Sequence, residues 1–189
     1  MNLDLVFALI FYALLFLFYL KNKEKFQVQG GIFALYKTQL GIKLMNKLAK
    51  KNPKLLRFLS TFSIGIGFIG MLFIIFTLFQ GVYKLIFNPA SPPVVAPVLP
   101  GVSISPNLPV LSFWHWIITI FIVAVVHEFA HGVYARLYNL KINSSGFAFL
   151  GPILAAFVEP DEKAMKKITA KKQLAIISAG PFINIILGI

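Results

Sequence analysis

The chain has 189 residues, of which 58% are hydrophobic, and its mean hydropathy is +0.82. These values exclude an ordinary soluble domain, which has a lower share of apolar residues. The formal net charge of +12 could suggest a nucleic-acid-binding protein, but the lysines gather between long apolar runs, as in multi-pass membrane proteins. We therefore expect a lipid bilayer and no nucleic acid as a partner. Without cysteine, any metal must bind His, Asp or Glu side chains.

The first apolar run covers residues 1–20 and ends at a cluster of lysines that begins with Lys21. Its length is enough to cross a hydrocarbon core of about 30 Å. No basic residue precedes the run, so it lacks the charged start of a signal peptide. We expect a first transmembrane helix with an extracytoplasmic N-terminus.

Residues 21–57 hold ten of the eighteen Lys and Arg residues, which places this segment in the cytoplasm. Two strand-like runs flank Gly30-Gly31, a pattern that predicts a β-hairpin. Leu40, Leu44 and Leu48 then recur at every fourth position among lysines. This spacing predicts a short amphipathic helix on an anionic membrane surface, although a solvated basic face on a small cytoplasmic element explains it equally well.

The segment 58–84 is the second predicted transmembrane helix, because no charged residue occurs from Phe58 to Tyr83. Residues 85–112 contain seven prolines and no charge, which predicts an extended extracytoplasmic loop. A linker is the simplest role for this loop, and an apolar lid is the alternative.

The third predicted transmembrane helix, 113–138, carries the sequence His-Glu-Phe-Ala-His. His127 and His131 are four residues apart, so on a helix both imidazoles lie on one face and can hold one metal ion. Glu128 is close enough to handle the proton of a water molecule. Packing histidines beside an acid are the alternative, but ionisable groups within a membrane are costly and usually mark function. Because Arg136 follows, the site should lie roughly 8 Å below the cytoplasmic boundary.

Residues 139–173 begin with an apolar run that is too short to cross a membrane and contains Gly151-Pro152, which forces a turn. We expect a cytoplasmic re-entrant loop or hairpin that dips toward the metal. Three acids, Glu159, Asp161 and Glu162, then precede several lysines. This order is typical of a helix start, so helix capping is favoured over metal ligation.

Residues 174–189 begin a fourth apolar segment, which reaches only about 24 Å. We therefore expect a truncated fourth transmembrane helix. The predicted fold class is an all-α polytopic membrane protein with about four transmembrane helices, a small membrane-associated β-hairpin element and a re-entrant loop.

The HEFAH sequence of the third helix, the stretch Gly146–Glu162 and the sequence AGPFIN at 179–184 together resemble the site-2 protease family. These proteins are intramembrane zinc metalloproteases, and archaeal members are the most similar. The resemblance covers most of the chain, and it is specific because HEFAH lies in a membrane helix ahead of an AGPxxN-type segment.

The resemblance implies that His127 and His131 bind Zn²⁺ and that Glu128 is the catalytic base. It also implies that the Gly30-Gly31 hairpin and the loop Phe147–Val158 are membrane-associated strands that present a transmembrane protein substrate in extended form. The candidate substrate-binding residues are Phe147, Phe149, Gly151 and Asn184.

One part of the family pattern is missing. The family's third zinc ligand is an Asp in an LDG-type motif on a later helix, and nothing in this chain matches it. Zinc hydrolases need three protein ligands and one open position. We therefore expect residues 1–189 to be the N-terminal part of a longer protease and to be inactive alone.

Two other functions remain compatible with the residues. A metal-ion transporter or channel would use His127 and His131 as a transient site, but it needs a polar path, and the second span offers few polar side chains. A non-catalytic membrane binding protein would keep the histidines without using them.

Overall fold

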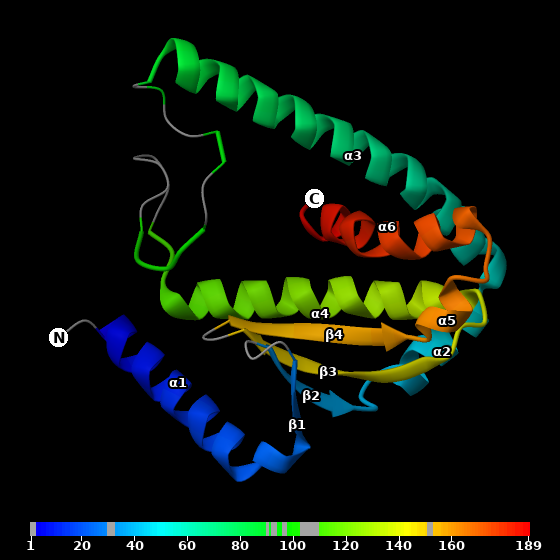
Figure 1. Cartoon of the computed structure of the whole chain (residues 1–189), viewed down its shortest axis with the longest axis horizontal. Helices are drawn as coiled ribbons and strands as arrows, with labels where there is room; N and C mark the ends of the chain where they lie inside the picture. Colours follow the sequence, from blue (N-terminus) through cyan, green and yellow to red (C-terminus); the bar gives the residue numbers. More distant parts are fainter. Residues whose placement is uncertain are drawn as a thin grey trace.

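The computed structural model describes residues 3–29, 33–89, 91, 94–95, 98–102, 110–150 and 153–189. It is mostly helical with one small antiparallel sheet, as Figure 1 shows. The α-helices are α1 (Leu3–Lys21), α2 (Ile42–Lys51), α3 (Pro53–Phe87), α4 (Phe113–Leu137), α5 (Glu162–Met165) and α6 (Ala170–Leu187). The strands are β1 (Phe26–Gln29), β2 (Phe33–Thr38), β3 (Ile142–Leu150) and β4 (Ile153–Pro160), and a 3₁₀ turn, Lys23–Lys25, precedes β1.

Three helices in the described part of the chain are long and apolar enough to cross a membrane: α1, α3 and α4. They occupy the three long apolar runs in which the sequence predicts transmembrane helices. The 18-residue helix α6 is not among them, so a fourth membrane-spanning helix stays a prediction.

The burial pattern of α3 is the reverse of that in a soluble helix. Its buried residues are Ser60, Ser63 and Gly81, whereas Phe73 and Phe79 are 68% and 72% exposed. Small and hydroxylated residues at helix contacts, with large apolar side chains turned outward, are typical of a helix surrounded by lipid. The hydroxyls are satisfied across helix contacts, since Ser63 Oγ and Ser178 Oγ are 2.9 Å apart.

The sheet has the order β1-β2-β3-β4, and all its neighbouring strands are antiparallel. It is larger than the predicted hairpin and re-entrant loop, because these two elements pair with each other through β2 and β3, with Tyr36 opposite Phe147. The sequence patterns that predict each hairpin do not predict that β2 pairs with β3. It removes two unpaired strand edges, which are costly near an apolar phase. The predicted turns at Gly30-Gly31 and Gly151-Pro152 lie outside the described residues.

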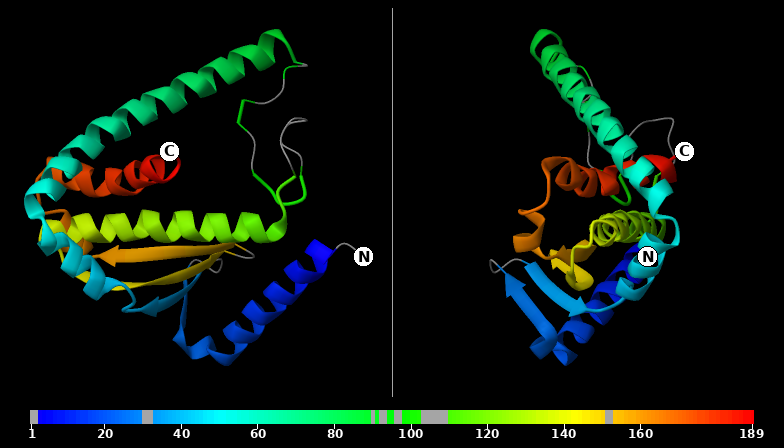
Figure 2. Two further views of the ribbon diagram at one scale, coloured as in Figure 1. Left: turned by 180° about the vertical axis from the view of Figure 1, so that it is seen from behind. Right: turned by 90° about the vertical axis from the view of Figure 1, so that its right-hand side faces the viewer.

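The helix α4 lies between α6 on one side and the sheet on the other, as Figures 1 and 2 show. The strand β4 is the sheet's edge nearest to α4. The buried core joins α2, α4 and α6 through residues such as Met45, Ala135, Ile176 and Ala179. Every functional residue discussed below lies on α4 or on an element packed against it.

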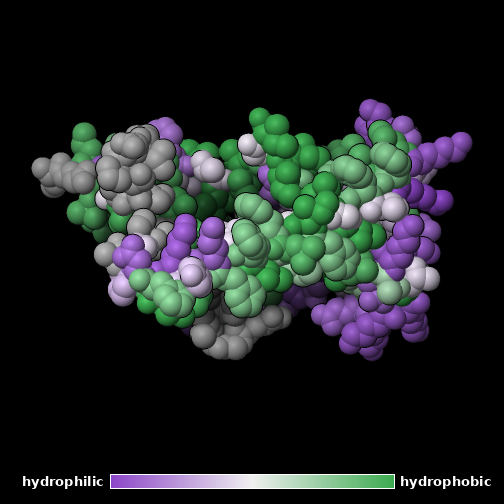
Figure 3. All heavy atoms as spheres, turned by 90° about the horizontal axis from the view of Figure 1, so that it is seen from above, coloured by the Kyte–Doolittle hydropathy of each residue, from purple (hydrophilic) through white to green (hydrophobic). Residues whose placement is uncertain are grey.

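The predicted amphipathic helix is found as α2. Met45 and Ala49 are buried against the core, while Leu40, Leu44 and Leu48 remain 64%, 51% and 37% exposed. In Figure 3 hydrophilic residues gather at one end of the molecule and apolar residues cover its middle. An exposed leucine row beside lysines fits the predicted contact with a membrane surface.

Candidate metal centre

The two histidines of α4 lie one helical turn apart and face the same way. The centroids of the His127 and His131 rings are 4.8 Å apart. Together with Glu128 they form the group of possible metal ligands found in the described part of the chain, with ligand atoms within 4.8 Å of one another. The four-residue spacing of the two histidines therefore brings their rings together on one face of α4, as the sequence predicts.

Helix α6 passes these histidines with a glycine. A Cβ atom at Gly180 would collide with Nε2 of His127 and with Nε2 of His131. Both Nε2 atoms therefore lie against the α6 backbone at Gly180, an approach that a side chain at residue 180 would block. Two imidazole nitrogens this close to each other and to a carboxylate oxygen are ligands that suit zinc, so the residues present fit the ion that the family resemblance implies.

The other nitrogen of each ring contacts α6. Nδ1 of His131 lies 2.6 Å from the backbone oxygen of Ile176. Since a carbonyl only accepts, the His131 proton sits on Nδ1, and Nε2 is free to bind a metal.

Asn184 of α6 contacts the other ring, that of His127. Its amide nitrogen lies 2.9 Å from His127 Nδ1, and its Oδ1 is buried without a hydrogen-bond partner. The two amide ends are interchangeable by a half-turn, which would let Oδ1 accept the Nδ1 proton of His127. That arrangement satisfies the buried oxygen and again leaves Nε2 free. Asn184, which the sequence suggested as a substrate-binding residue, is thus placed against a histidine.

Glu128 points away from α6 and toward the sheet. Its Oε2 accepts a hydrogen bond from the backbone N–H of Val158 at 3.1 Å. Because strand N–H groups alternate in direction, those of Ala156 and Leu154 point to the same outer edge of β4. The carboxylate is therefore anchored on a strand edge beside the metal centre.

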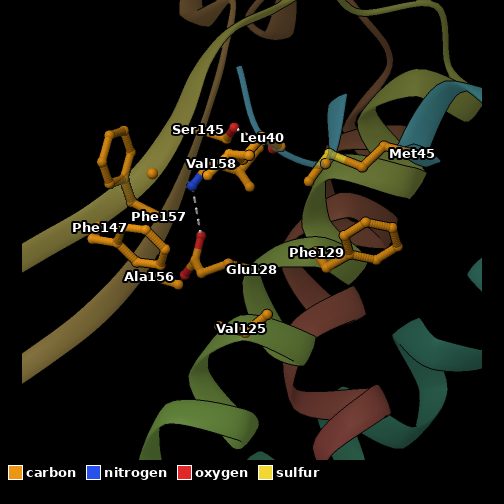
Figure 4. A pocket seen from close by; sticks show the side chains of 12 residues that line it. Leu40, Met45, Val125, Glu128, Phe129, Ser145, Phe147, Ala156, Phe157 and Val158 are labelled. Carbon is orange, nitrogen blue, oxygen red and sulfur yellow. Dashed lines mark hydrogen bonds between the residues drawn. The ribbon is translucent and has the colours of Figure 1, made fainter. Parts of the chain in front are cut away.

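A hollow of about 170 Å³ adjoins the Glu128 carboxylate (Figure 4). Its walls are mainly apolar and come from α2, α4, β3 and β4, including Met45, Val125, Phe129 and Phe157. An apolar side chain of about the size of leucine would fit next to the carboxylate.

The other predicted substrate-binding residues are distributed along the sheet. Phe147 lines the hollow and also lies 5.9 Å from the ring of Phe121. The ring of Phe149 packs on Phe26 at 5.5 Å, farther from the histidines. Gly151 lies outside the described residues.

Two acids at the end of β4 and directly after it contact groups other than the histidines, and one of them caps a helix as the sequence predicts. Asp161 is the N-cap of α5, where its side chain accepts from the N–H of Ala164 at 2.9 Å. Glu159 is not a cap: its carboxylate accepts a hydrogen bond from Ser144 and forms a 2.9 Å ion pair with Lys37. The Ser144 hydroxyl, followed by Lys37, lowers the pKa of Glu159. Neither acid joins the histidines.

The HExxH group thus lies on a helix long and apolar enough to cross a membrane, with a strand edge and apolar side chains beside it. Residues 115–189 match peptidase family M50, the site-2 protease family, so the resemblance seen in the motifs is confirmed over this part of the chain.

An uncharacterized protein of the archaeon Methanocaldococcus jannaschii is 32% identical to this chain over 203 residues. The alignment covers 99% of the chain and 50% of that protein, so the chain spans about half the length of the curated relative it matches. No solved structure matches the chain at a significant level.

Proposed function

We propose that the chain carries the zinc-binding helix of an intramembrane metalloendopeptidase that cleaves transmembrane protein substrates. The observation that carries this proposal is the pair of Nε2 atoms that converge in front of Gly180, with Glu128 beside them on a helix long and apolar enough to cross a membrane. The family match supports the same reaction class.

In this proposal His127 and His131 hold zinc through Nε2, while Ile176 and Asn184 fix the ring orientations. A zinc ion held there supplies Lewis acidity, which polarises a peptide carbonyl and makes water more acidic. Glu128 accepts the proton of the attacking water on its carboxylate and passes it to the leaving amine. The Val158 N–H keeps that carboxylate at the site before substrate arrives.

Strand β4 is suited to hold the substrate. The peptide bonds of a transmembrane helix are shielded, so the segment to be cut must unwind into an extended form. The outward N–H groups of Ala156 and Leu154 offer such a segment strand-like hydrogen bonds close to Glu128. Phe147 and the hollow beside Glu128 would receive an apolar substrate side chain.

We further propose that a third zinc ligand comes from outside residues 1–189 and that this chain alone does not cleave. Within the described residues two histidines and Glu128 form the metal group, and the acids Glu159 and Asp161 are engaged elsewhere. Zinc- and Glu128-dependent hydrolysis of a membrane peptide by purified 1–189 would refute this part of the proposal.

The test of the function replaces Glu128 by Gln in the full-length protein. Gln keeps the shape and removes the base, so we expect cleavage of a transmembrane reporter to fall about 10²- to 10⁴-fold while zinc content is unchanged. Glu24→Gln, an acid in the exposed 3₁₀ turn, is the matched control and should cleave normally. Undiminished cleavage by Glu128→Gln would exclude the mechanism.

A further inference from the structure

Two neighbouring hollows lie at the end of the molecule where α4 ends and α3 and α6 begin. One, of about 230 Å³, is lined by Lys50, Arg57 and Arg136, and the other, of about 330 Å³, by Arg57, Lys171 and Lys172. They share Arg57, Leu137 and Asn139. We call this pair of hollows the basic crevice.

The charge of the basic crevice is not balanced by protein groups. Neither hollow has an acidic residue in its lining, and the ion pair found among the described residues, Lys37 with Glu159, is on the sheet. Arg136 donates to the side chain of Asn46 and to a backbone carbonyl, both neutral. Several cations around one concave surface create a positive potential that favours an anion.

The start of α6 adds to this potential. Its N-cap, Thr169, makes no side-chain capping hydrogen bond and lies in the lining of the larger hollow together with Lys171. The positive end of the helix dipole therefore acts in the same place as the lysines. The helix dipole only adds to the positive potential of the basic crevice, which comes from the Arg and Lys side chains.

The position of the basic crevice along the helices matches the level of lipid phosphates. Arg57 and Lys172 are each six residues before a partner in the Ser63–Ser178 hydrogen bond, so each lies about 9 Å below that bond along its own helix. Beyond Arg57 the helix α3 is uncharged as far as Tyr83. The crevice thus lies where the apolar parts of the helices end, and lipid phosphates lie just outside the hydrocarbon core.

We propose that the basic crevice binds the phosphate of an anionic phospholipid, with Arg57 between the two hollows as its central contact. Exposed apolar side chains on the membrane side of Arg57, including Phe58 at 68% and Phe62 at 52%, offer a surface for the acyl chains. Free phosphate would leave this surface unused, which favours a lipid. Basic pockets between membrane helices are suited to anionic headgroups. The bound lipid would connect α3, α4 and α6, the last two of which hold the metal centre.

The test measures lipid retention by native mass spectrometry of the purified chain in a neutral detergent, with phosphatidylglycerol and phosphatidylcholine as probes. We expect preferential retention of phosphatidylglycerol. In the double variant Arg57→Gln/Lys172→Gln, retention should fall about thirtyfold, because each cation beside an anionic headgroup contributes a factor of about five.

The matched control is Lys163→Gln/Lys166→Gln, which removes the same charge from exposed positions in and directly after α5, outside the basic crevice. Its retention should stay within about twofold, since exposed charges at a distance are screened. Lys171→Gln/Lys172→Gln repeats the test without changing α3, so a folding defect at Arg57 would not hide the answer.

Three results would overturn the proposal. Equal losses in the crevice and control variants would show a non-specific charge effect. Equal retention of phosphatidylcholine would show that the negative headgroup is not recognised. Displacement of the lipid by an equal concentration of inorganic phosphate would identify a free phosphate site.

Discussion

Gly180 lets the backbone of α6 approach the two imidazoles of α4. In a helix interior, Ala is more favourable than Gly by about 0.5 to 1 kcal/mol, so Gly180→Ala should stabilise α6 by propensity alone. The added Cβ, however, would collide with both Nε2 atoms. We therefore expect Gly180→Ala to lose at least about 90% of bound zinc, because ligand geometry tolerates only about 0.2 Å of error.

Zinc content of the purified protein, measured by elemental analysis with circular dichroism alongside, checks this prediction. Gly70→Ala is the matched control, since a Cβ at Gly70 on α3 meets nothing within 4 Å. Normal zinc content in Gly180→Ala would mean that the metal does not lie between α4 and α6.

Asn184 acts on the same centre through His127. Removing its side chain frees the His127 ring and deprives Nδ1 of its partner. We expect Asn184→Ala to weaken zinc binding about 10- to 100-fold, as for other groups that orient metal-binding histidines. Asn184→Asp keeps an oxygen that can accept from Nδ1 and should weaken binding less. Competition with a zinc chelator measures both affinities, and equal affinity of Asn184→Ala and the unchanged protein would contradict the role.

The proposed metal-binding and base residues could be identified from the sequence, whereas the glycine packed against them could not. His127, Glu128 and His131 follow from the spacing alone, because a helix places residues four apart on one face. Gly180 has no side chain, and its role depends on how α6 approaches α4. The sequence shows only a glycine inside an apolar segment, and a glycine there is equally typical of close packing between any two membrane helices.

At the scale of elements, the sheet shows what local patterns miss. Each hairpin is a local event that a turn between two runs predicts. The pairing of β2 with β3 joins residues such as Tyr36 and Phe147, which are far apart in the chain, and no periodicity records it. The long helices were easier to predict, because an apolar run long enough to cross a bilayer has few other structures open to it.

Glu159 links three strands, since it contacts Lys37 of β2 and Ser144 of β3 from its own strand, β4. Its folded-state pKa lies below the ordinary value of 4.5, mainly because the Ser144 hydroxyl and then Lys37 favour the charged carboxylate. The resulting stabilisation is present above the ordinary value and is lost as pH falls through the folded pKa. It is modest, because the side chain is 39% exposed.

We therefore expect Glu159→Gln to lower the thermal stability at pH 7 and to have a smaller effect at a pH of about 3. Thermal unfolding in detergent at the two pH values measures the difference, and Glu24→Gln, in the exposed 3₁₀ turn, serves as control. A loss of equal size at both pH values would show that the charge of Glu159 is not what joins the strands.

At the scale of the whole molecule, the two ends differ in charge. The basic crevice and the lysines of α2 and α5 lie at one end, where Figure 3 shows the hydrophilic residues. The start of α4 lies at the opposite end, and Asp4 of α1 accepts a hydrogen bond from the N–H of Phe113 there at 2.7 Å. The chain's N-terminal helix thus starts at the end away from the basic crevice.

Because basic segments remain on the cytoplasmic side, we expect the basic end to face the cytoplasm and the N-terminus to face outward. The chain contains no cysteine, so single introduced cysteines report topology without a background. A membrane-impermeant maleimide added to intact cells should label Ser112→Cys. Lys47→Cys and Lys166→Cys should react only after the membrane is permeabilised.

The two basic-end positions also test the fold independently of its orientation. Lys47 belongs to α2 and Lys166 directly follows α5, and both elements contribute to the core around α4. They must therefore react from the same side of the membrane, whichever side that is. Labelling from opposite sides would contradict the packing of these elements around α4. Labelling of both positions in intact cells would agree with the fold but show the opposite orientation in the membrane. The metal centre would then lie nearer the outer leaflet.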